Sequence, residues 1–170
     1  MPARVPVAWI TLGGLLTLTL SVLPASPTAQ NPDLIARGKH LVEVAAACGE
    51  CHTPTTATGE PDETYHLAGH VAGSPVPSNT AFKAFHGEGV TYARNLTPDP
   101  ETGLGGWTKE EFRRALKEGI AKGGRPLRLP MPWERFRKIL SNQDIDAIWA
   151  YLRSLPPVKN RVPDHVGASR

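Results

Sequence analysis

Apolar residues recur at helical spacing in three parts of the chain, and each part begins with its own start signal. The first begins at Asn31-Pro32, where asparagine is a favoured N-cap and proline is favoured at the first helical position. The apolar residues after it recur at intervals of three and four up to about Ala47. The sequence therefore predicts a helix over residues 32–47.

The other two helical segments begin with residues that can cap them. Thr108 begins "TKEE", a capping box with Glu111, and the helix it starts is predicted to end at Gly119 or at the later Gly123-Gly124. Ser141 begins "SNQD" in the same way, and Pro156-Pro157 ends the apolar stripe that follows. A shorter helical turn over residues 133–140 is expected before this last helix.

The stretch between Thr53 and Gly106 shows no convincing helix or strand pattern. It is rich in Thr, Pro, Gly, His and Asn. A structureless loop of this length is uncommon inside a compact domain. Unless a local pattern is hidden in it, we expect the segment to wrap around something other than protein core, and a large buried ligand would explain it.

Residues 1–29 have the pattern of an export signal. Arg4 is the only early charge, an apolar run from Val5 to Leu23 follows, and "PASPTAQ" supplies small residues before a cleavage point. An uncleaved membrane anchor is the alternative, because about 17–19 weakly apolar residues can just span a bilayer. We therefore predict an exported, periplasmic protein, either soluble or tethered. The domain is expected over residues 30–158, and 159–170 as a flexible tail.

Composition agrees with one loop-rich globular domain. The chain has 170 residues, of which 40% are hydrophobic, and it contains 16 glycines and 17 prolines without a repeat. The formal net charge is only +3. Because no dense basic run is interleaved with aromatic residues, nucleic acid is not an expected partner.

Both cysteines of the chain lie in "AACGECHTP", residues 46–54, and a histidine follows the second. A structural zinc site needs four ligands, and only the pair His66 and His70 offers a second group. A redox pair of the thioredoxin type requires a strand before the motif. A plain disulfide is chemically possible in an exported protein but leaves His52 unexplained.

The pattern Cys-x-x-Cys-His is typical of covalent haem attachment. The thiols of Cys48 and Cys51 are spaced to form thioethers with the two vinyl groups of a haem. The adjacent His52 is then placed to ligate the iron. The export signal fits as well, because covalent haem is attached after export. We therefore predict one covalently bound haem c.

Met131 is the one methionine besides Met1, and it lies between two prolines in "RLPMPWERF". The alternative is an ordinary buried methionine in a turn. Flanking prolines stiffen the loop, which favours Met131 as the distal iron ligand. With both axial positions filled, the protein is expected to carry electrons and not to be an enzyme. If Met131 does not bind, the chain is a peroxidase or a small-ligand or redox sensor, and the other candidate ligands are His66, His70 and His86.

Three stretches, "ARNLTPDPETGLGGWTKEEF", "LPMPW" and "DIDAIWAYLRSLPPV", extend the motif to a family resemblance over residues 32–158. The chain resembles class I cytochrome c, and more narrowly the cytochrome c subunits of bacterial membrane-associated dehydrogenases for alcohols, gluconate or nicotinate. The resemblance implies an all-α fold, in which three to five helices and long loops surround one covalent haem. It also implies Cys48 and Cys51 as thioether anchors, His52 as proximal ligand and Met131 as distal ligand.

The resemblance also implies several supporting roles and the partners. Gly38 falls where the first helix crosses the last closely, against Ile148 and Tyr151. A dehydrogenase subunit as donor and an oxidase or another respiratory acceptor are the expected redox partners. Possible contacts to the haem propionates come from Asn95, Trp107 and Arg125, although Trp107 as core and Arg125 as a solvated loop residue are alternatives.

Overall fold

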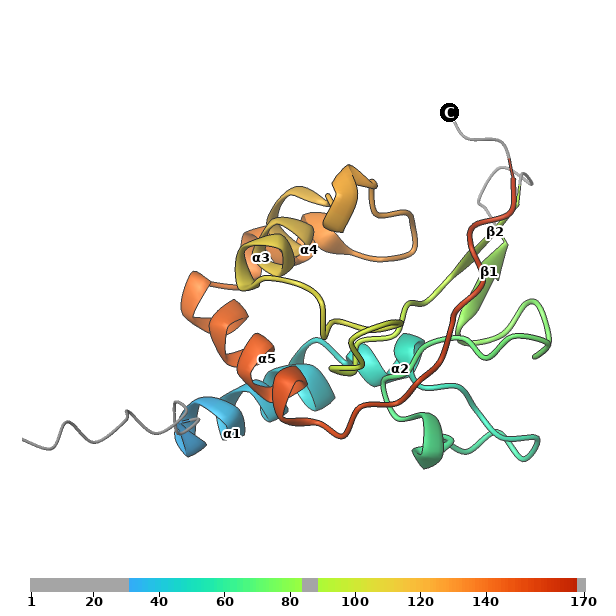
Figure 1. The fold of residues 1–170 in the computed structure, drawn as a ribbon, viewed down its shortest axis with the longest axis horizontal. Coiled ribbons are helices and arrows are strands. Elements are labelled where there is room, and N and C mark those ends of the chain that lie inside the picture. Colours follow the sequence, from blue (N-terminus) through green and yellow to red (C-terminus); the bar gives the residue numbers. More distant parts are fainter. Residues whose placement is uncertain (1–30, 84–88, 168–170) are drawn as a thin grey trace, which may run out of the picture.

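The computed structural model describes residues 31–83 and 89–167, so the predicted signal or anchor over 1–29 lies outside the described residues. The fold is mainly helical and carries one small hairpin (Figure 1). None of the described helices is long and apolar enough to cross a membrane. The elements in chain order are α1 (Pro32–His40), the π-helix η1 (Leu41–Ala45), α2 (Cys48–His52), the 3-10 helix η2 (Glu63–Tyr65), β1 (Ala81–Lys83), β2 (Val90–Tyr92), α3 (Lys109–Glu118), the 3-10 helix η3 (Lys122–Gly124), α4 (Trp133–Ile139) and α5 (Asn142–Ser154).

The predicted start signals all form. The Asn31 side chain accepts from two backbone amides in the first turn of α1. The capping boxes that begin at Thr108 and Ser141 are both complete. The first helix differs from the prediction in one respect: from Leu41 it widens into a π-helix, and the attachment motif forms a separate short helix, α2.

Helices α1 and α5 cross at Gly38, as predicted. A Cβ atom at this position would lie 2.0 Å from the carbonyl oxygen of Ala147 and 2.7 Å from Cβ of Tyr151. Tyr151 is therefore a confirmed contact, and the backbone closest to a Cβ at Gly38 belongs to Ala147. The buried side chains around this crossing form the apolar core: Val42, Leu67, Leu104, Phe112, Leu116, Phe136, Leu140, Ile145, Ile148, Tyr151 and Leu152.

The segment over residues 53–106 contains short elements that the sequence pattern does not predict. Strands β1 and β2 form an antiparallel hairpin, in which Ala81 pairs with Tyr92. Each strand has three residues, which is too short for a visible alternation of apolar and polar positions. Much of this segment is instead held by buried polar residues, namely Thr53, His70, Thr80, Asn95, Thr97 and Asp99.

The segment after α5 does not form the flexible tail that was expected from residue 159. Residues 158–166, here called the C-terminal strap, run back beside the hairpin, where Val166 bridges to Val90 (Figure 1, red). Within the strap, Asn160 and Val162 are buried. Residues 159–167 thus differ from the expected tail, because buried Asn160 hydrogen-bonds the body of the fold, although Lys159 and Arg161 beside it are exposed.

Candidate haem site

Helix α2 presents the three residues of the attachment motif together. Positions i, i+3 and i+4 lie on the same face of a helix, and these are Cys48, Cys51 and His52. Cys48 is half-buried and Cys51 is exposed, and both are free thiols. The disulfide interpretation of the two cysteines is therefore not supported. Ala47, in the left-handed conformation at φ 49°, separates this helix from η1.

The imidazole of His52 is oriented by a backbone carbonyl. His52 is 8% exposed, and its Nδ1 lies 2.7 Å from the carbonyl oxygen of Arg94. Because a carbonyl only accepts, Nδ1 carries the proton and Nε2 keeps its lone pair. Burial lowers the pKa of His52, and the bond to Arg94 offsets this only in part. The ring is therefore neutral at pH 7 with Nε2 as the nitrogen available to a metal.

Two loop segments hold His52 from different sides. The amide of Gly69 donates to the carbonyl oxygen of His52 at 2.7 Å. A Cβ atom at Gly69 would lie 2.5 Å from the carbonyl oxygen of Ala93, so the two segments pack backbone to backbone. We call this arrangement of His52 with residues 68–70 and 93–95 the proximal clamp. It fixes both the backbone and the ring of the histidine.

Met131 lies on the loop between η3 and α4. Its amide donates to the carbonyl oxygen of Arg128 at 3.1 Å, and its own carbonyl accepts from the amide of Trp133 at 3.0 Å. Met131 is half-buried and packs against the apolar core at its edge, as Cys48 does. The structure thus brings Met131 and Cys48, two of the three sulfur-bearing residues of the predicted site, to one apolar cluster.

The environment of the thiols keeps them protonated. Burial, followed by the nearby carboxylate of Glu43, raises the pKa of Cys48 to about 12. Partial burial also raises the pKa of Cys51. Without a haem, both side chains are therefore poor nucleophiles at neutral pH.

The three residues considered as propionate contacts differ in burial and in how far other protein groups already use their polar atoms. Asn95 is buried, and its amide donates to Thr102 Oγ1 and the Val158 carbonyl while accepting twice from Thr97. These bonds use its donors and its acceptor, which favours a role in holding the loop. Trp107 is half-buried against the apolar core.

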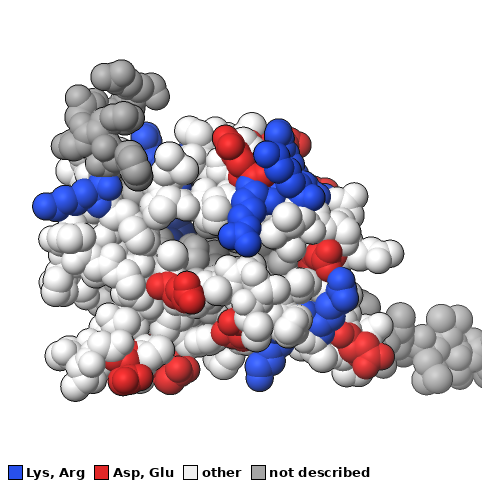
Figure 2. All heavy atoms as spheres, turned by 180° about the vertical axis from the view of Figure 1, so that it is seen from behind, with Lys and Arg blue, Asp and Glu red and all other residues white. Residues whose placement is uncertain are grey.

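Arg125 lies in a group of arginines. Its side chain is exposed, and partial desolvation together with nearby Arg94 and Arg128 lowers the pKa of its guanidinium. Figure 2 shows a hollow near the middle of one face of the molecule, with Lys and Arg side chains mostly above it and Asp and Glu mostly below. This face therefore offers charges of both signs around its hollow.

The loop histidines have protein partners. His66 Nε2 lies 3.0 Å from Glu43 Oε1, and Tyr151 donates to the same carboxylate oxygen at 2.6 Å. His70 is buried, with its Nδ1 2.9 Å from Thr80 Oγ1. Over the described ranges no three His, Cys, Asp or Glu side chains group as a metal site, so the zinc interpretation gains no support. His86 lies outside the described residues.

The partners that orient the site were not found from the sequence. The Arg94 carbonyl is a backbone group, and every residue has one, so the residue type gives no indication of this role. Glu43 did carry a signal, since it is a charged residue between Val42 and Val44 in a helix with an apolar face, and its carboxylate does collect two donors.

The residues present fit a covalently bound haem. Two free thiols and one imidazole share a helix face, and the imidazole has Nδ1 committed to a carbonyl. A haem-ligating histidine requires this arrangement, with its second nitrogen hydrogen-bonded and Nε2 left for the iron. The half-buried Met131 supplies a thioether at the edge of the same apolar cluster.

Comparison with known proteins agrees with this chemistry. The sequence model of the family described as Cytochrome c matches residues 35–156. The chain is 33% identical over 142 residues to a subunit of nicotinate dehydrogenase from Pseudomonas putida, covering 84% of this chain and 10% of that protein. It is 35% identical over 141 residues to the cytochrome c subunit of the quinone alcohol dehydrogenase of Gluconobacter oxydans, covering 80% and 25%.

A further relative is the cytochrome c subunit of gluconate 2-dehydrogenase from Pantoea cypripedii, which is 29% identical over 141 residues, covering 82% of this chain and 27% of the relative. The chain spans only about a tenth to about a quarter of the length of these three relatives. The likeness to dehydrogenase cytochrome subunits that the sequence motifs indicated is thereby confirmed. With its mainly helical class I fold, the chain belongs to the cytochrome c family.

Proposed function

We propose that the chain carries one haem c and passes single electrons from a dehydrogenase to a respiratory acceptor. The observation that carries the proposal is the orientation of His52, whose Nδ1 is 2.7 Å from the Arg94 carbonyl. This bond leaves Nε2 as the ligating atom on a helix face that also bears both thiols. The single Cys-x-x-Cys-His motif supports one haem.

In this proposal Cys48 and Cys51 anchor the haem, and His52 and Met131 hold its iron. The bound haem supplies exchange between Fe(III) and Fe(II). The protein contributes the ligands, a low-dielectric surround and exclusion of water from the apolar side of the site. With Met131 in the sixth position no site is left for a substrate, so the chain itself is proposed to be an electron-transfer subunit and not a catalyst.

The partner class comes from the names of the relatives. Two of them are cytochrome c subunits, of a quinone alcohol dehydrogenase and of gluconate 2-dehydrogenase. We therefore propose a dehydrogenase as the electron donor. An oxidase or another respiratory carrier as acceptor is a proposal from the carrier role alone.

Residues 1–29 support export, with the chain periplasmic and either soluble or anchored by this segment. Fractionation of cells expressing the full chain, with intact mass measurement, tests this part. A periplasmic protein lacking about 29 residues is expected on the signal-peptide pattern. A cytoplasmic protein without haem would contradict export.

Covalent attachment is tested by the mass of the purified protein and by haem staining after denaturing electrophoresis. Wild type is expected to carry the mass of one haem. The double variant Cys48→Ser/Cys51→Ser is expected to lose the stain, whereas Ser154→Ala, which leaves the motif intact, retains it. A wild-type protein without covalent haem would overturn the proposal.

The electron-carrier role is tested by stopped-flow reduction with a quinone-dependent alcohol dehydrogenase. Each molecule of the oxidised protein is expected to take up one electron, and the reduced protein is expected to bind carbon monoxide poorly. Ready binding of carbon monoxide together with peroxide turnover would favour the peroxidase or sensor alternative.

A further inference from the structure

The C-terminal strap contacts residues 68–70, the first wall of the proximal clamp, through Asn160. The side-chain amide of Asn160 donates to the carbonyl oxygens of Ala68 at 2.8 Å and His70 at 3.0 Å. These two carbonyls flank Gly69, whose own amide bonds the carbonyl of His52. Asn160 is 8% exposed, so both bonds are shielded from water and removal of the donors leaves two buried carbonyls without them.

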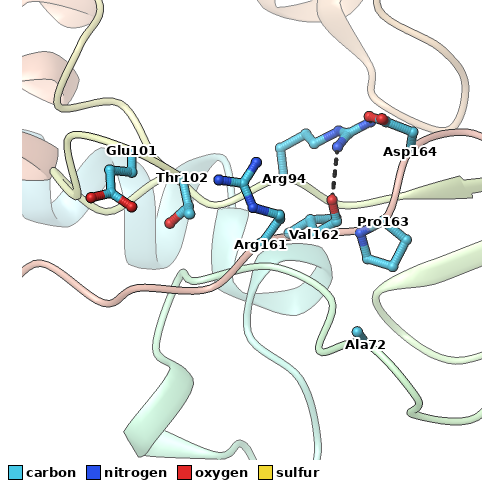
Figure 3. Close-up of a pocket in the computed structure, with 8 residues that line it drawn as sticks. All are labelled: Ala72, Arg94, Glu101, Thr102, Arg161, Val162, Pro163 and Asp164. Carbon is cyan, nitrogen blue, oxygen red and sulfur yellow. Dashed lines mark hydrogen bonds and ion pairs between the residues drawn. The ribbon is translucent and has the colours of Figure 1, made fainter.

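The same strap contacts residues 93–95, the second wall of the clamp, through two backbone carbonyls and the carboxylate of Asp164. The guanidinium of Arg94 donates to the carbonyl oxygen of Val162 at 3.2 Å and bonds Asp164 at 3.2 Å. Figure 3 shows this side chain reaching across to the strap at Val162 and Asp164. The Asn95 amide donates to the Val158 carbonyl at 2.7 Å. The residues that follow the hairpin are thus fixed to the strap on both sides of the Arg94 carbonyl.

Each wall of the clamp makes one bond to His52, and the strap bonds to both walls. From this arrangement we infer that the strap, through Asn160, positions the proximal histidine. The inference rests on the proposed function, because the orientation of His52 matters for the carrier only if its Nε2 ligates iron. Asn160 touches neither the histidine nor the cofactor site, so it is a positioning residue.

The hydrogen bond between His52 Nδ1 and the Arg94 carbonyl affects the reduction potential of a haem iron bound at Nε2. A strong bond to Nδ1–H raises the basicity of the imidazole as a ligand. A more basic ligand favours Fe(III) over Fe(II), so weakening the bond raises the reduction potential. Loosening the clamp also exposes the Nδ1 proton to exchange with solvent.

The first variant is Asn160→Asp, which keeps the shape but replaces the amide donor by a carboxylate facing two carbonyls. Asn142→Asp is the matched control, because Asn142 is exposed in the first turn of α5 and the substitution adds the same charge. NMR of the oxidised, haem-loaded full chain follows exchange of the His52 Nδ1 proton, which paramagnetic iron shifts away from other signals.

In Asn160→Asp the exchange is expected to speed up by about tenfold or more. The reduction potential is not the readout for this variant, because its added negative charge by itself favours Fe(III). Asn142→Asp is expected to exchange the His52 Nδ1 proton at the rate of wild type. A second variant, Arg94→Lys, keeps the charge but gives up the fork that bonds both Val162 and Asp164. It is expected to speed up the exchange by a smaller amount and, because the charge is conserved, to raise the reduction potential above that of wild type, which keeps the test open if Asn160→Asp does not fold.

Unchanged proton exchange in folded Asn160→Asp, or unchanged exchange and potential in Arg94→Lys where only that variant folds, would overturn the inference. The proposed function fails in a different way, since a wild-type protein without any iron-shifted Nδ1 proton of His52 would show that this histidine is not a ligand. The two failures are therefore distinguished by the wild-type spectrum alone.

Discussion

At the crossing of α1 and α5, two helices meet through apolar side chains and one glycine, whereas in the proximal clamp the end of α2 and two loop segments meet through hydrogen bonds. Gly38 lets the helices approach until backbone touches backbone. In the clamp, the ring of His52 is held by a carbonyl, and the neighbouring segments are held by side chains such as Asn95 and Asn160.

The two regions are therefore expected to be destabilised by different kinds of substitution. Apolar packing is non-directional, so the crossing tolerates changes that conserve volume and fails when volume is added. A buried polar network fails when a single donor is removed, because the partner left behind is desolvated and unpaired. The crossing is therefore expected to respond to size and the clamp to hydrogen bonding.

The largest effect is expected from filling the crossing. Gly38→Leu places a side chain where even a Cβ would lie 2.0 Å from the Ala147 carbonyl oxygen, so α1 and α5 must separate. We expect a loss of about 3 kcal/mol or more in the free energy of unfolding, or no folded protein. Urea denaturation of the haem-loaded protein measures it.

Gly106→Ala provides the control for that substitution. A Cβ at Gly106 meets its nearest neighbour, the carbonyl oxygen of Pro100, at 3.4 Å, which is ordinary contact. Its stability is expected to stay close to that of wild type. A Gly38→Leu variant that is equally stable would show that the two helices do not cross at this glycine.

A smaller effect is expected from Thr97→Val, which keeps the shape and removes one hydroxyl. Thr97 is 1% exposed. Its hydroxyl lies 2.7 Å from Asn95 Oδ1 and accepts a hydrogen bond from the Val158 amide. We expect Thr97→Val to lower the free energy of unfolding by about 1–3 kcal/mol. Thermal or urea unfolding measures it.

Thr58→Val is the matched control, because Thr58 is exposed and its hydroxyl bonds only a neighbouring surface threonine among the described residues. It is expected to change stability by about 0.5 kcal/mol or less. Equal losses for the two threonines would mean that the buried hydroxyl of Thr97 does not hold the Asn95 segment of the clamp, and the contrast with the helix crossing would disappear.

Asp144 is a polar group within the apolar region, and it predicts a pH dependence. The Ser141 hydroxyl, further bonds from the Ser141 amide and the Arg37 guanidinium lower the pKa of Asp144. Since the folded-state pKa lies below the unfolded value of about 3.9, the carboxylate stabilises the fold at neutral pH. This contribution is lost as pH falls through the lowered pKa.

The substitution Asp144→Asn is therefore expected to lower the free energy of unfolding by about 1–2 kcal/mol at pH 7, as for other lost helix caps. The difference from wild type is expected to shrink as the pH is lowered below about 4. Urea unfolding across pH measures both. A difference that is constant from pH 7 to pH 3 would show that the charge of Asp144 is not what stabilises α5.

The smallest effect on stability is expected outside both regions, at Arg125. Its side chain is exposed, and partial desolvation, followed by the nearby charges of Arg94 and Arg128, lowers the pKa of its guanidinium. Arg125→Gln is expected to change the free energy of unfolding by about 0.5 kcal/mol or less. If Arg125 contacts a haem propionate, as the family resemblance implies, the loss of its positive charge lowers the reduction potential, which potentiometric titration measures.

The sequence predicted the apolar region far better than the clamp. Periodic apolar residues and three caps, at Asn31, Thr108 and Ser141, located the long helices, and their caps formed as expected. These features are local and repeat along the chain. The attachment motif was equally visible because its chemistry needs fixed residue types at fixed spacing.

The clamp was not predictable because its decisive partners are distant in the chain and are mostly backbone atoms. His52 meets the carbonyl of Arg94, 42 positions away. Asn160 meets carbonyls 92 and 90 positions away. A polar residue such as Asn160 near the end of the sequence resembles a solvated tail until the fold shows what it bonds.

The central claim is that His52 and Met131 hold the iron of one covalent haem, and near-infrared absorption of the oxidised protein tests it most directly. A methionine sulfur bound to Fe(III) gives a charge-transfer band in this region. We expect the band in wild type and its loss in Met131→Ala with the covalent haem retained. Absence of the band in wild type, or its persistence in Met131→Ala, would contradict the claim.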